Sequence, residues 1–211
     1  MKVLGKRLNG RESYGQAASA HASPFLFDEL PFRFTKELDR TARLAVMLAK
    51  SRALEWISAA DFLAAMYLNH WERLDSYWQD SGDIEKYLAS LCRVSPQRWH
   101  KWLLEFEAAR RVENGNGRDK FSLRKRRRPS NAKNGLGISR ELQSMFRRAA
   151  RITPGRERRA GKIIPILTSE SVLLAMARET SSQIGQRLAS TGLDVERLER
   201  SAKDPKRAPI H

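Results

Sequence analysis

The stretch "SQIGQRLASTGLDVERLE", residues 182–199, contains a helix, a stop and a second helix in quick succession. Its ending has a counterpart earlier in the chain, because "LCRVSPQRW", residues 91–99, places the same kinds of residue in the same order. An apolar residue, a helix-capping side chain and a second apolar residue match as Val94, Ser95 and Trp99 against Leu193, Asp194 and Leu198. The stretch is therefore interpreted as the closing piece of a unit that the chain uses twice.

The beginning of each unit repeats as well. An apolar residue and a hydroxyl cap open a first helix at Phe34-Thr35 and, 104 residues later, at Ile138-Ser139. The second helix opens at Ile57-Ser58 and Leu167-Thr168, where the offset is 110 because the second unit has a longer first connection. The third helices match at an offset of 100, since a tryptophan-rich stretch is inserted in the first unit. Further matched residues are Leu38 with Leu142, Ala42 with Phe146, Ala45 with Ala149, Phe62 with Val172, Ile84 with Ile184, and Leu88 with Leu188.

These patterns predict an all-α fold of two pseudo-symmetric four-helix repeats. Each unit would expose one apolar side if it stood alone, so the two should pack on each other around a shared core. A run of turn formers and like charges separates them and predicts a flexible linker. The predicted divisions are a flexible N-terminal tail (1–29), the first repeat (30–111), a basic linker (112–135), the second repeat (136–202) and a C-terminal tail (203–211).

The two units resemble the Clp repeat (Clp R, Clp N-terminal) domain, which precedes the ATPase modules of Clp/Hsp100 unfoldases. The marks of the resemblance are the second-helix start "TSESVLL", residues 168–174, and the ending "LASTGLDVERL", residues 188–198. The resemblance implies a helical pseudo-dimer that receives substrates, peptides or adaptor proteins and has no catalytic role. Because no ATPase module follows in these 211 residues, it further implies a freestanding domain. The expected partners are a protein or peptide, such as a Clp/Hsp100-type unfoldase, its protease or a secretion component.

Four residues are candidates for binding a peptide or protein. By the resemblance, Thr35 and Glu170 lie at the edge of a groove between the repeats, although Thr35 is also a plain helix cap. Ala60 stands where the first unit would carry the matching glutamate, so a symmetric pair of acids is absent. Trp71 and Trp78 fall in the unmatched insertion, where they serve either as anchors for a partner or as a local cap on the core.

The net charge of +16 is concentrated after residue 110: residues 111–137 carry +7 and residues 138–211 carry another +7. This distribution favours an acidic partner at the linker and the second repeat. The alternative function is that of a basic nucleic-acid-associated helical protein that binds the phosphate backbone, without recognition of base sequence. A basic face that docks an acidic protein explains the same charges. The candidate side chains are Arg124, Lys125, Arg126, Arg127, Arg128, Arg147 and Arg148.

Several kinds of chemistry are not predicted. The single cysteine, Cys92, excludes an internal disulfide and a paired-cysteine zinc site, and the histidines lack metal-ligand spacing, so we expect no metal, no cofactor and no enzyme activity. "GRERRAGKI", residues 155–163, has the wrong glycine spacing for a phosphate loop and is expected to be a solvated connection between helices. No apolar run is long enough for a bilayer span, so no membrane partner is predicted. The single cysteine fits a reducing cytosol, which predicts a cytoplasmic protein.

Overall fold

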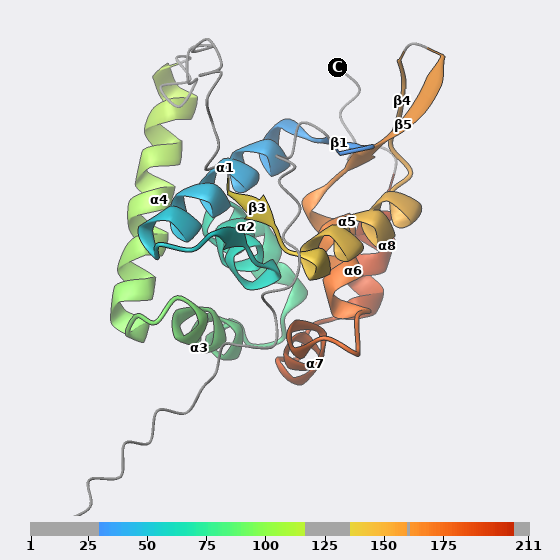
Figure 1. Cartoon of the computed structure of the whole chain (residues 1–211). Coiled ribbons are helices and arrows are strands. Elements are labelled where there is room, and N and C mark those ends of the chain that lie inside the picture. Colours follow the sequence, from blue (N-terminus) through green and yellow to red (C-terminus); the bar gives the residue numbers. More distant parts are fainter. Residues whose placement is uncertain (1–29, 117–135, 160, 205–211) are drawn as a thin grey trace, which may run out of the picture.

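The computed structural model describes residues 30–116, 136–159 and 161–204 (Figure 1). Within these residues the chain forms eight α-helices, one short 3-10 helix and five short strands. The helices are α1 (Lys36–Ser51), α2 (Ala59–Leu74), η2 (Asp75–Tyr77), α3 (Ser81–Leu91), α4 (Pro96–Asn116), α5 (Arg140–Ile152), α6 (Ser169–Ala177), α7 (Gln183–Ser190) and α8 (Val195–Ala202). The strands are β1 (Arg33–Phe34), β2 (Trp56–Ile57), β3 (Gly137–Ile138), β4 (Arg156–Arg159) and β5 (Lys162–Leu167).

The hydroxyl residues that the sequence places before the helices are N-caps in the structure. The side chains of Thr35 and Ser139 accept hydrogen bonds from the third backbone N–H of α1 and of α5. Ser58 opens α2 in a full capping box with Asp61, and Thr168 opens α6 in one with Ser171. The predicted starts of these four helices are confirmed.

Two central helices, α2 and α6, carry most of the core. Both are buried on nearly every face; α1 packs against α2, and α5 packs against α6. Aromatic rings join the two halves of the chain, since Phe146 of α5 lies 5.0 Å from Phe62 of α2 and 5.3 Å from Phe34, measured between ring centroids. Residues from both sides of the central basic segment therefore share one core.

The all-α prediction is wrong in one respect, because short strands precede four of the helices. Together with β4, these strands form a three-stranded sheet in the order β1-β5-β4 and a two-stranded sheet of β2 and β3. The parallel pairs place Phe34 opposite Leu167 and Ile57 opposite Ile138. Extended residues before a cap have backbone groups that no helix satisfies, and here a strand from the other half of the chain satisfies them.

The segment "GRERRAGKI", predicted as a solvated connection, instead contains β4 and the start of β5, which pair as an antiparallel hairpin. Glu157 pairs with Ile164, and Arg158 pairs with Ile163. The β-branched residues of "KIIPIL" favour a strand, and Gly161 adopts a positive φ of 77° at the turn, where a glycine is unstrained. The glycines and basic residues of this segment obscure the strand pattern in the sequence.

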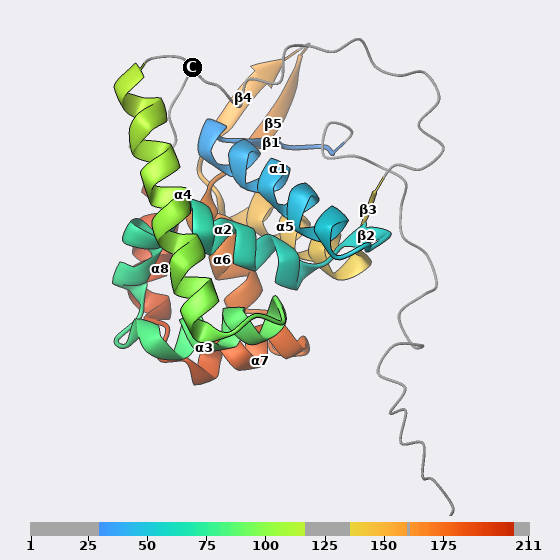
Figure 2. The same ribbon diagram turned by 90° about the vertical axis from the view of Figure 1, so that its left-hand side faces the viewer.

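The first half of the chain also differs in detail from the prediction. Helix α4 continues to Asn116, beyond the predicted end of the first repeat at Arg111, and it packs against α2 and α3 before extending past them (Figure 2). The tryptophan-rich stretch, residues 69–82, forms the last part of α2 up to Leu74, with a kink at His70, and then η2 and the start of α3. The predicted N-terminal tail (1–29), residues 205–211 of the predicted C-terminal tail (203–211) and most of the predicted linker lie outside the described residues.

Candidate functional site

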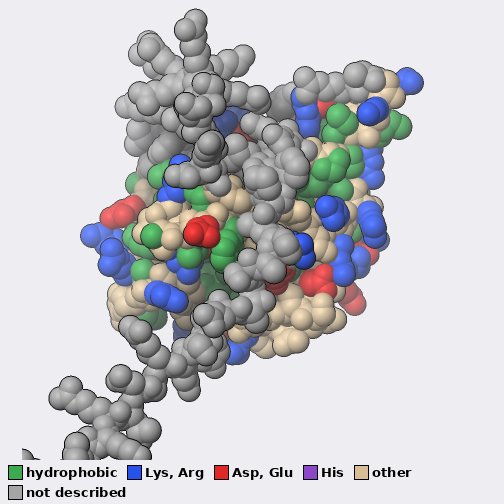
Figure 3. Space-filling model, in the orientation of Figure 1, with side chains coloured by type: hydrophobic (Ala, Val, Ile, Leu, Met, Phe, Trp, Pro, Cys, Tyr) green, Lys and Arg blue, Asp and Glu red, His purple; other side chains and the backbone are tan. Residues whose placement is uncertain are grey.

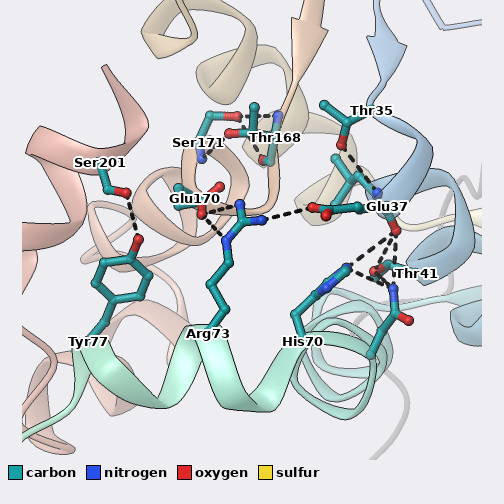
Figure 4. A network of polar contacts seen from close by, with 12 residues as sticks. Thr35, Glu37, Thr41, His70, Arg73, Tyr77, Thr168, Glu170, Ser171 and Ser201 are labelled. Carbon is teal, nitrogen blue, oxygen red and sulfur yellow. Dashed lines mark hydrogen bonds and ion pairs between the residues drawn. The ribbon is translucent and has the colours of Figure 1, made fainter. Parts of the chain in front are cut away.

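A guanidinium group joins three helices near the start of α1 and of α6 (Figure 4). Arg73, in the last turn of α2, donates from Nε to Oε1 of Glu170 over 2.6 Å and from Nη1 to Oε2 of Glu37 over 2.9 Å. Its Nη2 also donates to Glu170. Both carboxylates lie in the first turn of their helices, where the helix dipole favours negative charge. The three side chains therefore fix the relative positions of α1, α2 and α6.

The two ion pairs differ in their exposure to water. The Glu170 side chain is only 1% exposed, whereas that of Glu37 is 51% exposed and that of Arg73 is 35% exposed. Burial alone would lower the pKa of the Arg73 guanidinium, but the Glu170 and Glu37 carboxylates outweigh it and raise that pKa above its ordinary value. Arg73 therefore stays charged, and the outer part of the cluster, formed by Glu37 and Arg73, is open to solvent.

A buried histidine lies one turn before Arg73. The ring nitrogen Nε2 of His70 lies 2.8 Å from the side-chain amide nitrogen of Asn69 and 3.4 Å from the carbonyl oxygen of Glu37. Burial lowers the pKa of the imidazole, although the nearby Glu37 carboxylate acts in the opposite direction. The ring is therefore expected to be neutral at neutral pH, which suits a structural contact at the kink of α2.

The structure brings Thr35 and Glu170 to neighbouring helix starts, because β1 and β5 are paired immediately before them. Thr35 is buried; its backbone N–H donates to Leu167 over 3.0 Å, and its hydroxyl caps α1. Its interpretation as a plain helix cap is the one that these contacts support. Sequence reasoning missed Arg73 and Glu37, the residues that connect Glu170 to the surface. An arginine in the last turn of a largely apolar helix was the available signal.

The two tryptophans of the candidate set belong mainly to the core. Trp78 is 7% exposed, and its indole N–H donates to the hydroxyl of Thr191 over 3.0 Å. Its backbone forms a bridge with Leu193, in the turn between α7 and α8. Trp71 is partly buried against the core, and its indole nitrogen is buried without a hydrogen-bond partner in the described part of the chain. Trp78 thus holds the two halves of the chain together rather than facing a partner.

Of the basic candidates, only Arg147 and Arg148 lie within the described residues; Arg124, Lys125, Arg126, Arg127 and Arg128 lie outside them. Both described arginines are exposed on α5, and Arg148 forms an ion pair of 2.8 Å with Glu179. Arg140 and Arg151 are exposed on the same helix. Lys and Arg side chains are frequent on the side of the molecule that carries α5 and the hairpin (Figure 3).

Among the described residues, no cluster of three or more His, Cys, Asp or Glu side chains could hold a metal ion. Burial raises the pKa of the Cys92 thiol to about 11, so this side chain is protonated at neutral pH and is a poor nucleophile. No described helix is both long and apolar enough to cross a membrane. No family model, no curated protein and no solved structure matches the chain.

Proposed function

We propose that the chain is built from two pseudo-symmetric helical repeats of the Clp N-terminal type and that it binds a protein or peptide without catalysing a reaction. The observation that carries the repeat is the reciprocal strand pairing. Phe34 and Ile57 precede the first and second helices of one proposed repeat, and Ile138 and Leu167 precede those of the other. The first strand of each repeat pairs with the second strand of its counterpart, as expected for two copies related by a twofold axis.

The turn before the last helix of each proposed repeat gives a second, independent support for the repeat. Arg93 has a φ of 55° and Gly192 a φ of 72°, and the two occupy the same place in their proposed repeats, one residue after the helix C-cap. A left-handed residue is common at the end of a helix, but an arginine rarely adopts it without a structural demand. The next helix is then capped in the same way, by Ser95 before α4 and by Asp194 before α8.

We place the proposed binding surface where the first turns of α1 and α6 meet. Here Glu37 and Arg73 are the partly exposed polar groups, held in place by the buried Glu170. A preorganised pair of opposite charges at a helix start suits the polar groups of a bound peptide or protein loop. By the resemblance stated above, the partner is an unfoldase of the Clp/Hsp100 type, its protease, or a component of a secretion machinery, and the compartment is the cytoplasm.

The test is affinity capture with a matched pair of variants, followed by direct titration of each purified partner. Glu37→Lys reverses a charge within the proposed surface, and Glu105→Lys makes the same change on the exposed face of α4. We expect wild type and Glu105→Lys to bind the same partner with equal affinity and Glu37→Lys to bind it at least tenfold more weakly. Thermal melts of both variants check that the fold is kept. Equal binding by both variants would contradict the proposed surface.

The second candidate function is binding to a nucleic-acid backbone, and one observation favours it. Arg140, Arg147 and Arg151 project from the exposed face of α5 and form no ion pair with any side chain in the described ranges. The double variant Arg147→Gln/Arg151→Gln should then flatten the slope of log affinity against log salt by roughly 1.4 to 1.8, since each lost phosphate contact contributes about 0.7 to 0.9. Binding whose salt slope ignores this change would exclude the α5 surface.

A further inference from the structure

The β4–β5 hairpin projects beyond the helices (Figure 1). In the sheet order β1-β5-β4, strand β5 is central, and among the described residues β4 has a neighbouring strand on one side only. Strand β1 contributes two residues, whereas β4 has four, so β4 is the longer of the two edges. An unpaired strand edge presents backbone donors and acceptors that can pair with another extended chain.

The hydrogen-bond pattern shows which backbone groups of β4 face outward. Ile166 donates its N–H to the carbonyl oxygen of Gly155, so this pair is hydrogen-bonded. In an antiparallel ladder, hydrogen-bonded and non-hydrogen-bonded pairs alternate. Glu157 is therefore bonded to its partner Ile164, while the N–H and C=O of Arg156 and Arg158 point away from β5. Arg156 and Arg158, which are separated by Glu157, therefore offer two N–H groups and two C=O groups to an added strand.

The side chains of β4 give the two faces of this edge different charges. Arg156 and Arg158 lie on one face because side chains alternate along a strand, and Glu157 lies on the other, where it forms an ion pair of 2.9 Å with Arg33. Arg158 is exposed and has no ion-pair partner among the side chains that the structure describes. Its cross-strand neighbour Ile163 is 70% exposed, so an apolar surface adjoins the arginines.

We propose that the outer edge of β4 binds an extended acidic segment of another protein by strand addition. The added strand carries carboxylates at alternate positions, which face Arg156 and Arg158, and uncharged residues between them, which face Glu157. This site shares no residue with the one at Glu37 and Arg73 and does not depend on the function proposed for it.

A second copy of the chain is a poorer occupant of the same edge. Two β4 strands paired with each other would bring the arginines of one copy close to those of the other, and like charges directly opposite destabilise a strand pair. The same arginines that oppose self-association attract an acidic strand, so they select the partner both by attraction and by repulsion. A nucleic acid would use the charges but would not need the outward backbone groups.

The decisive variants separate the backbone from the charge. Arg158→Pro removes the outward N–H together with the side-chain charge, and Arg158→Gln removes the charge alone. Proline is tolerated on an edge strand when its missing N–H faces solvent, so the hairpin should persist in both variants. The probes are two labelled peptides of equal composition: acetyl-VEVEVE-amide, which alternates, and acetyl-VVVEEE-amide, which does not.

Fluorescence anisotropy and amide exchange of the full chain measure the binding. We expect the alternating peptide to bind, to slow exchange of the Arg156 and Arg158 amides, and to leave the Glu157 amide unchanged. Arg158→Gln should weaken it several-fold, and Arg158→Pro by roughly a further tenfold, because one backbone hydrogen bond is lost. The block peptide should bind at least tenfold more weakly than the alternating one.

Several outcomes would overturn the proposal. Equal affinity of Arg158→Pro and Arg158→Gln would show that the outward N–H is not used, and equal affinity of the two peptides would reduce the effect to charge attraction. Protection of the same two amides in a concentrated sample without peptide would assign the edge to a second copy of the chain. If neither peptide binds while an oligothymidylate of equal charge binds wild type and Arg158→Pro alike, the basic surface is a phosphate site.

Discussion

Loss of the Arg73 side chain tests the role of the polar cluster most sharply. In Arg73→Met the apolar stem is kept, but the carboxylate of Glu170, which is 1% exposed, loses its guanidinium partner. Removal of one partner of a buried ion pair costs about 3 to 5 kcal/mol, because the remaining charge is buried without compensation. Arg73 is partly exposed, and the start of α6 itself favours a negative charge, so we expect the lower end, about 3 kcal/mol.

The assay is urea unfolding monitored by far-UV circular dichroism. With an m-value of about 2 kcal/mol/M, a loss of about 3 kcal/mol lowers the midpoint by about 1.5 M. The matched control is Glu37→Gln, which breaks the other ion pair of the same arginine. Since the Glu37 side chain is 51% exposed, this change should cost less than about 1 kcal/mol.

A double variant distinguishes a buried charge from a general packing defect. Arg73→Met/Glu170→Gln removes both charges and should be more stable than Arg73→Met alone, because position 170 then no longer carries a buried charge that has lost its guanidinium. The reasoning is refuted if Arg73→Met unfolds within about 0.5 M of wild type. It is also refuted if Glu37→Gln is as costly as Arg73→Met, since the difference in burial would then have no energetic effect.

Three further predictions concern other parts of the core. Burial lowers the pKa of His70 in the folded state, so as the pH falls the unfolded chain binds a proton at this residue before the folded chain does. The unfolding free energy should therefore be constant above a pH of about 6.5 and fall below it by up to about 1.4 kcal/mol per pH unit. Urea titrations at several pH values should show that His70→Asn removes this slope. Gly185→Ala should destabilise by at least about 2 kcal/mol in thermal melts, since the new methyl group would clash with the carbonyl oxygen of Glu179, whereas Gln183→Ala on the exposed side of α7 should change stability by less than about 0.5 kcal/mol. Cys92, the only cysteine, should react with Ellman's reagent at pH 8 roughly a hundredfold more slowly in the folded chain than in urea, because burial raises its pKa to about 11; equal rates would contradict the assigned burial.

The candidate site was only partly predictable. Glu170 was named only through the resemblance to the Clp repeat domain, and the structure shows it buried beside Arg73. The two residues are 97 positions apart, and no periodicity or spacing relates a residue in the last turn of one helix to the first turn of another. From the sequence, Trp78 could be either an anchor for a partner or a local cap on the core. Its hydrogen bond to Thr191, which is also distant in the chain, supports the second interpretation.

The sequence by itself determined the local structure. Hydroxyl caps at Thr35, Ser58, Ser139 and Thr168, followed by apolar residues at helical spacing, set where the main helices begin, because capping and amphipathicity act within a few residues. What only the tertiary structure decided was the pairing of segments. The residues before the caps become strands because each lies beside its partner from the other half of the chain, as Phe34 does beside Leu167. A two-residue strand has no periodic signal of its own, so its backbone hydrogen bonds exist only once the helices have packed.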